Sequence, residues 1–466
     1  MKTIIKRELL DYLQSIQFVV LLVVSAILFL ANGMILVKKY NEQNSFYNQR
    51  VAVVRENPST VSTTLYRKPN QLLFISEGGD KYRPVGYTLK PKSGFSALPS
   101  GPRNFKLPVI PELDWSFIIK VIFSLYAILL GYNAISGEKE QGTLRQILSN
   151  SVGRIRLLIA KYIAILLTIL VPLVAGIIIS LIVVGISIPQ ILALSNLSRI
   201  FVMFLLTLGY LSIFVLLSLL ISSLIHKSSL VLLMLLAVWV LFAVFIPNIS
   251  GILSEKLSSV PSEFQTAKKI GPMIQQQVWQ RIDRVRERVK SGELKTEEEV
   301  KQETDRAFDE GQDDLIKHYK LYDDAMKQRA VMAQNLSRLS PTALFQYASE
   351  SIAQTGAKQE ERFLRDTRNY ANIYDDYILE KVGKLVATSM WSFSTDIIIN
   401  GKSVYISSPH PEEYQGDKSD FPQFVESRAS LADSLGNALF DIAVLILWNI
   451  ILAVLAFSAF LRSDVR

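Results

Sequence analysis

Six long apolar runs limit what this chain can fold into. A helix needs about 20 consecutive apolar residues to cross the hydrocarbon core of a bilayer, where every backbone polar group must find its partner within the helix. Runs of this kind occupy residues 16–37, 115–134, 157–184, 200–220, 230–247 and 439–461. The sequence therefore predicts an α-helical membrane protein with six transmembrane helices, in which a tight turn joins the fourth to the fifth.

Basic residues predict which way the chain crosses the membrane, because cytoplasmic loops are enriched in Lys and Arg. The basic residues of the short connections are Lys2, Lys6, Arg7, Lys139, Arg145, Arg154, Arg156, Lys227, Arg462 and Arg466. Nearly all basic residues of the short connections thus fall on one side if both termini are cytoplasmic; the short connection after the third span offers only Arg199. The formal net charge of +8 follows from the same bias, so we expect no nucleic acid among the partners.

The absence of cysteine fits a protein of the bacterial inner membrane whose outer parts carry no disulfide. The first apolar run is longer than the core of a cleaved signal peptide, which spans about 7–15 residues. We therefore expect it to be retained as a span. Apolar residues on one side of residues 1–15 and basic residues off it predict an amphipathic helix that lies in the membrane interface.

This orientation leaves two long segments outside the cytoplasm, and the first of them is residues 38–114. Short β-rich runs at 51–54 and 71–76, separated by turn-rich stretches, predict a partly β structure there. The second segment, residues 248–438, is expected to be mainly helical. The sequence thus predicts a helical domain with a small β component outside the cytoplasm.

Local signals divide the second segment further. Apolar residues at three- and four-residue steps from 274 to 289 predict a helix that stops at Gly292, and Thr296 with Glu299 forms a capping box for the next one. The pair Ser340-Pro341 is expected to end that helix. The dipeptide Asn400-Gly401 predicts a β-hairpin between residues 396–399 and 402–406.

No pattern in the sequence is typical of an enzyme. It contains no GxxxxGK[ST] phosphate-binding loop, no HExxH zinc motif and no GxSxG nucleophile turn, and it has only 3 histidines. We expect no catalytic residue and no metal site on this chain. It has no recognisable means of hydrolysing ATP, so any driving energy must come from another subunit.

Three ionisable residues lie near the ends of the predicted spans. Lys161 is expected to extend its stem to the nearby interface. Lys120 and Asp441 lie near the outer ends of the second and sixth spans. They either reach the interface independently or form an ion pair that joins the two helices.

The most informative connection is residues 135–156, between the second and third spans. It reads Ser136-Gly137-Glu138-Lys139-Glu140-Gln141-Gly142-Thr143-Leu144-Arg145, followed by apolar residues on one side. A short helix with a charged collar and an apolar face suits docking into a groove of a soluble partner. From the residues alone, a simple amphipathic linker explains the pattern equally well.

The amphipathic start, this segment and the succession of spans together resemble the permease subunits of ABC-2 type (type V) ATP-binding-cassette transporters. In that family the Glu-Lys-Glu-x-Gly-Thr stretch belongs to the coupling region that meets the ATPase subunit. The positions that match it, with the glycine that precedes it, are Gly137, Glu138, Lys139, Glu140, Gly142, Thr143, Leu144 and Arg145. The two outer segments are longer than in compact members, and residues 462–466 would form a short cytoplasmic tail.

The resemblance implies a function and a set of partners. Two ATPase subunits, which bind ATP and Mg, would drive a pair of permeases, either two copies of this chain or this chain and a related one. The pair would export or extract a lipidic, amphipathic or peptide-like substrate, in contact with membrane lipids and with an envelope accessory protein. The alternative is a mechanotransmitter or scaffold that acts on an envelope partner without transporting cargo.

Overall fold

The computed structural model describes residues 2–80, 83–92, 94–98, 113–149, 153–258, 260, 263–385, 394–399, 401–407 and 412–462. Within these residues, 6 helices are long and apolar enough to cross a membrane, which confirms the predicted fold class. They are α2 (Ile16–Glu56), the helix made of α3, η2 and α4 (Trp115–Phe117, Ile118–Phe123 and Ser124–Gly131), α7 (Arg154–Ser187), α8 (Leu194–Leu224), the helix made of α9, η4 and α10 (Ser228–Val240, Leu241–Phe245 and Ile246–Leu257), and α15 (Leu431–Arg462).

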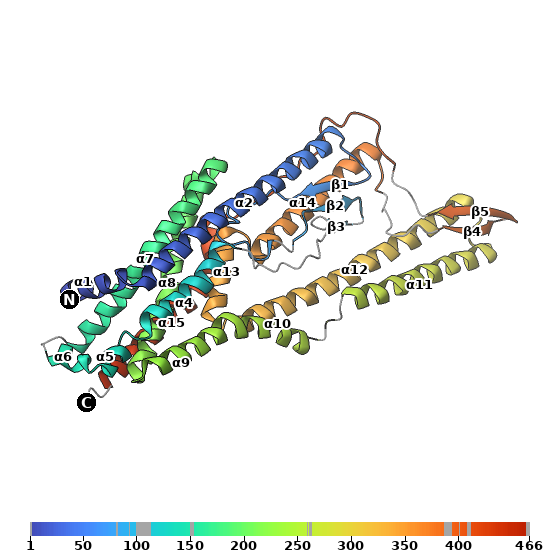
Figure 1. Ribbon diagram of the computed structural model, residues 1–466. Helices are drawn as coiled ribbons and strands as arrows, with labels where there is room; N and C mark the ends of the chain where they lie inside the picture. Colours follow the sequence, from blue (N-terminus) through green and yellow to red (C-terminus); the bar gives the residue numbers. More distant parts are fainter. Residues whose placement is uncertain are drawn as a thin grey trace.

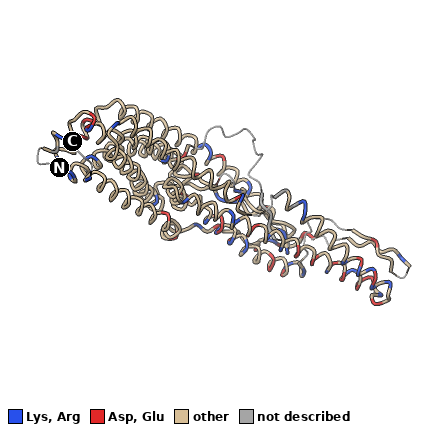
Figure 2. The backbone as a smooth tube through the Cα atoms, turned by 90° about the horizontal axis from the view of Figure 1, so that it is seen from below, with Lys and Arg blue, Asp and Glu red and all other residues tan. Residues whose placement is uncertain are grey.

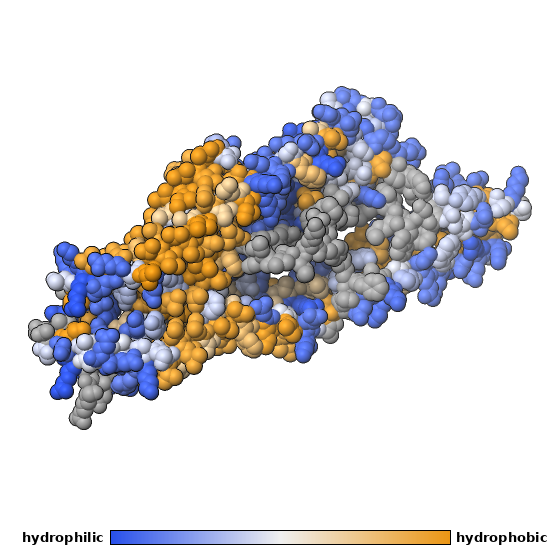
Figure 3. Space-filling view, viewed as in Figure 1, coloured by the Kyte–Doolittle hydropathy of each residue, from blue (hydrophilic) through white to orange (hydrophobic). Residues whose placement is uncertain are grey.

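The spans form one bundle, and the chain begins and ends at the same end of it (Figure 1). We call this the terminal end; it holds α1 (Lys2–Leu13), α5 (Ser136–Glu140) and α6 (Thr143–Ser149). A broad apolar surface covers the spans, and hydrophilic surface lies beyond it at both ends of the molecule (Figure 3). This banding is the surface expected of a protein that crosses a bilayer.

Side chains lock the bundle where helices come closest. An added Cβ at Gly176 of α7 would lie 2.3 Å from the ring of Phe29 on α2, so only glycine allows this approach. Trp115 is also buried there and donates its indole N–H to Ser180 at 3.0 Å. These contacts hold α2, α7 and the start of the second span together.

Two spans contain a π-helical segment, η2 and η4. Such segments bend a helix and leave carbonyl groups without their usual partner. The carbonyl of Lys120 in η2 accepts a hydrogen bond from the hydroxyl of Tyr210 at 3.2 Å, and that of Phe242 in η4 accepts one from Ser340. Trp239 joins the two helices by donating to Ser124 at 2.9 Å.

The first outer segment differs from its prediction in detail. Helix α2 continues to Glu56, so the predicted β run at 51–54 is wrong: its valines lie at the end of a helix that begins in the membrane, and no Gly or Pro interrupts that helix between Gly33 and Pro58. The run at 71–76 is wrong too, because it forms buried turns whose carbonyls accept the first N–H groups of α3. The β component is instead an antiparallel sheet of β1 (Thr63–Tyr66), β2 (Gly86–Lys90) and β3 (Gly94–Leu98).

The second outer segment contains the predicted helices in an extended arm. Its helices are α11 (Glu263–Lys290), α12 (Glu297–Ser337), α13 (Pro341–Ala353) and α14 (Ala357–Val382). Helices α11 and α12 lie side by side and project away from the bundle (Figure 1). The apolar stripe of α11 is buried against α12, and the capping box of Thr296 and Glu299 is confirmed.

A β-hairpin lies at the far end of the arm, as predicted. Strands β4 (Ser394–Ile399) and β5 (Lys402–Ser407) pair in antiparallel fashion. Gly401 adopts a φ of 81°, the left-handed conformation that a tight turn needs, while Asn400 lies outside the described residues. Gly292 likewise has a φ of 78° just after α11 and confirms the predicted stop.

Helix α13 has no counterpart in the sequence predictions. Ser340 does follow the end of α12, but it caps a new helix in which Pro341 is the first residue. Most of α13 is buried, and it packs against α8 and α15 of the membrane bundle. The outer segment therefore returns to the bundle before it forms α14.

Candidate functional site

The segment predicted to meet a partner forms two short helices at the terminal end, α5 and α6. Gly142 separates them with a φ of 72°, a left-handed conformation that glycine adopts without strain. The hydroxyl of Thr143 donates to the carbonyl of Glu138 at 3.3 Å across this turn. Leu144 is buried against the bundle, whereas Glu140 and Arg145 are exposed.

A buried ion triad fixes α5 to the bundle. The ammonium of Lys161, on α7, lies 2.7 Å from Glu138 Oε1 and 3.0 Å from Glu8 Oε1 on α1. The Lys161 side chain is 3% exposed, and each carboxylate side chain is 18% exposed. The expectation that Lys161 extends to the interface is therefore wrong: it turns inward and joins α1, α5 and α7.

The triad makes it costly to move α1 or α5 away from Lys161. Burial of a single ammonium without a partner costs several kcal/mol, and an ion pair with good geometry offsets that cost. With two carboxylates on one lysine, neither α1 nor α5 can leave without exposing or stranding a charge. The triad therefore makes the position of α5 depend on the position of α1.

Serine hydroxyls attach the start of α5 to the end of α8 and the start of α9. Ser222 Oγ accepts hydrogen bonds from the backbone N–H groups of Ile135 and Ser136 at 3.1 and 2.9 Å. Ser136 Oγ donates to Ser228 Oγ at 3.1 Å. The end of the second span is thus held by the fourth and fifth spans.

The two charged residues that follow Glu138 reinforce this attachment. Lys139 donates to the carbonyl of Ser223, and Glu140 accepts the backbone N–H of Ser228 at 3.3 Å. These contacts attach α5 to three spans, namely α7, α8 and α9.

The residues predicted as a site divide into two groups. The structure brings Glu138, Lys139 and Leu144 inward, and it leaves Glu140 and Arg145 at the surface. A Cβ added at Gly137 would lie 3.4 Å from Asn133, an ordinary contact, so this position does not require glycine. Sequence reasoning missed Glu8, Ser222 and Ser228, although a lone lysine in an apolar span is a signal that a carboxylate lies nearby.

The predicted pair between Lys120 and Asp441 is replaced by other partners. Asp441 receives two hydrogen bonds from Arg338, at 2.7 and 3.3 Å, and its side chain is 1% exposed. Lys120 donates to Gln346. The reason is that the end of α12 and helix α13, which the span pattern did not place, supply both partners.

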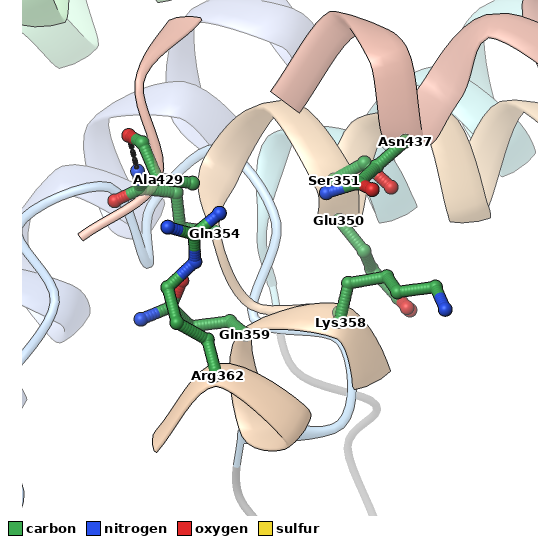
Figure 4. A pocket seen from close by; sticks show the side chains of 9 residues that line it. Glu350, Ser351, Gln354, Lys358, Gln359, Arg362, Ala429 and Asn437 are labelled. Carbon is green, nitrogen blue, oxygen red and sulfur yellow. Dashed lines mark hydrogen bonds between the residues drawn. The ribbon is translucent and has the colours of Figure 1, made fainter. Parts of the chain in front are cut away.

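A small cavity lies where α13 and α14 meet the start of α15. Glu350, Gln354 and Arg362 line a cavity of about 10 Å³ between α13 and α14, in which Gln354 donates to the carbonyl of Ala429 (Figure 4). That volume holds about one water molecule, so it is not a substrate site. In the described ranges, no group of three or more His, Cys, Asp or Glu could hold a metal ion.

These features define a class: a helical membrane protein with six candidate spans and a short two-helix element, α5 and α6, at one end of its bundle. The family model described as "ABC-2 family transporter protein" matches residues 2–465. The chain therefore belongs to the ABC-2 transporter family, as a membrane permease. No curated protein matches it.

Proposed function

We propose that this chain is the transmembrane permease subunit of an ATP-binding-cassette transporter that is driven by separate ATPase subunits. The family match supports a permease, and the attachment of α5 supports the coupling role. The observation that carries the proposal is the triad of Glu8, Glu138 and Lys161, which links the two-helix element to the bundle. ATP and Mg would bind to the ATPase subunits.

In this proposal the terminal end faces the cytoplasm of a bacterium, and α5 with α6 forms the coupling region. Closure of the ATPase subunits on ATP would push the exposed side of α5 and α6, which carries Glu140 and Arg145. Because α5 is tied to α7, α8 and α9, the push would rearrange the spans. The working assembly would contain a second permease.

The substrate is proposed to be lipidic, amphipathic or peptide-like, and it is exported or extracted from the membrane. Supporting this, the buried charges described above lie near the ends of the spans rather than at their centres. An ion or proton pathway would need such groups along its length. The α11–α12 arm would then receive the substrate or an envelope partner.

A second function is favoured by the length of the arm. Helices α11 and α12 extend far beyond the membrane bundle, and the β4–β5 hairpin packs against their far ends (Figure 1). A mechanotransmitter that moves an envelope partner would need such a lever. Cargo transport by a variant that lacks the arm's tip, β4 and β5, would exclude this alternative.

The test of coupling uses the exposed residues, because the buried triad also holds the fold, whereas Glu140 makes only one long hydrogen bond, to the N–H of Ser228 at 3.3 Å. The double variant Glu140→Lys with Arg145→Glu should no longer co-purify with the ATPase subunit, or its permease-stimulated rate of ATP hydrolysis should fall at least ten-fold. The matched control is Lys317→Glu, a charge reversal on the exposed face of α12. A fully stimulated complex with the double variant would refute the coupling role.

A further inference from the structure

A second cavity lies at the terminal end, between the coupling segment and the last span. It has a volume of about 440 Å³, which is within the range of about 300–1,000 Å³ for ligand pockets. Its walls come from α5, from the end of α8 with the turn that follows it, and from the end of α15. The lining residues are Lys139, Leu220, Ser223, Leu224, His226, Leu455, Ser458, Ala459 and Arg462.

The polar side of this groove is basic. Lys139, His226 and Arg462 line it, and no Asp or Glu is among its described lining residues. None of the three forms an ion pair in the part of the chain that the structure describes. The two acids that flank Lys139 are engaged elsewhere, Glu138 with Lys161 and Glu140 with the N–H of Ser228.

The other side of the groove is apolar and open to the membrane. Leu224 and Leu455 line it and are 60% and 45% exposed. Both lie near the ends of candidate membrane spans, so this wall borders the apolar part of the bundle. A ligand here would meet cations at one end and hydrocarbon at the other.

We propose that this groove binds one anionic phospholipid from the leaflet at the terminal end. The phosphate would accept charge-assisted hydrogen bonds from Lys139 and Arg462, with His226 as a further donor. The acyl chains would lie along Leu224 and Leu455 and continue into the bilayer. Basic pockets between membrane helices bind anionic headgroups by this combination of charge and depth.

The lipid would connect two parts of the permease that share few other contacts at this end. Lys139 belongs to the coupling segment, and Arg462 ends the sixth span. A headgroup that bridges them would stabilise α5 against α15 and make the coupling segment sensitive to anionic lipid. This inference does not depend on the substrate or on the presence of the ATPase.

The experiment measures lipid binding to the purified full-length chain by native mass spectrometry. Phosphatidylglycerol should bind at least ten-fold more tightly than phosphatidylcholine with the same acyl chains. Ala459→Trp, which fills the groove without a change of charge, and the double variant His226→Gln with Arg462→Gln should each reduce phosphatidylglycerol binding about ten-fold. The matched control Lys227→Gln removes a neighbouring charge that does not line the groove and should bind as the parent does.

Other outcomes would overturn the proposal. Equal binding of the two lipids, or equal loss with Lys227→Gln, would show that the groove does not select the headgroup. Binding of glycerol phosphate as tight as that of the lipid would assign a soluble phosphate ligand instead. If Ala459→Trp changes the oligomeric state and not lipid binding, a second copy occupies the groove; if Ala459→Trp does not fold, the charge variants decide alone.

Discussion

The two ends of the molecule hold their charges in different ways. At the terminal end, the side chain of Lys161 is 3% exposed and its ammonium contacts two carboxylates. Along the arm, Arg281 and Arg288 are 21% and 38% exposed, and the acids with which they pair are 33–61% exposed. Figure 2 shows basic and acidic residues along the whole length of the arm, whereas the membrane spans carry few of either.

This difference in exposure determines how much an ion pair contributes to stability at each end. An exposed pair gains little, because water and salt screen it, and the median contribution is about 0–1 kcal/mol. A buried pair is costly to break, because its removal leaves a charge without solvent. The arm's charges therefore keep a long helical hairpin hydrated, whereas the terminal triad determines where α1 and α5 lie.

The largest expected effect comes from removal of the buried cation. Lys161→Met leaves Glu8 and Glu138 facing each other, and we expect a loss of about 3–5 kcal/mol of stability. Thermal unfolding of the purified chain measures it. Neutralising all three residues, with Glu8→Gln and Glu138→Gln added, should recover most of the loss; a single variant as stable as the parent would contradict the buried triad.

A smaller effect is expected at the opposite end of the spans. Arg338→Met leaves the buried carboxylate of Asp441 without its partner, and since Arg338 is 25% exposed we expect a loss of about 2 kcal/mol. The same unfolding measurement applies, with Asp441→Asn added as the rescue. Lys120→Met is the control, because it removes the other cation that the sequence offered as a partner for Asp441. If a charge reversal at Lys120 rescued a charge reversal at Asp441, the ion pair between these two residues would be reinstated.

The smallest effect is expected in the arm. Arg306 is 72% exposed and lies 3.3 Å from Glu310, four residues along the same helix. Arg306→Gln should change stability by less than about 0.5 kcal/mol, and added salt should make the difference smaller still. A loss as large as that of Lys161→Met, in the same unfolding assay, would erase the contrast between the two ends.

The features that could be predicted are those set by residues close together in the sequence. The apolar runs predicted the spans, the capping pair of Thr296 and Glu299 predicted the start of α12, and Gly401 predicted a hairpin. The segment around Glu138 was identified as a candidate site in the same way, from its local pattern. Each of these signals is complete within a few turns of chain.

The features that were missed depend on residues far apart. Residues 51–54 have the β-branched composition of a strand, yet they continue a helix that begins in the membrane. Helix α13 is too short to be recognised as a span and is buried only because α8 and α15 surround it. Lys120 and Asp441 lie at a similar depth, but helices from the outer segment supply their partners.

By itself, the sequence determined that the chain crosses a membrane six times and that residues 136–145 form a distinct charged element, because hydropathy and helix capping act over short distances. Only the tertiary structure decided that Lys161 joins Glu8 to Glu138, and that Lys139 and Arg462 line one groove. The reason is physical: a buried charge takes whichever partner the packing of distant helices brings within about 3 Å, and no local pattern encodes that choice.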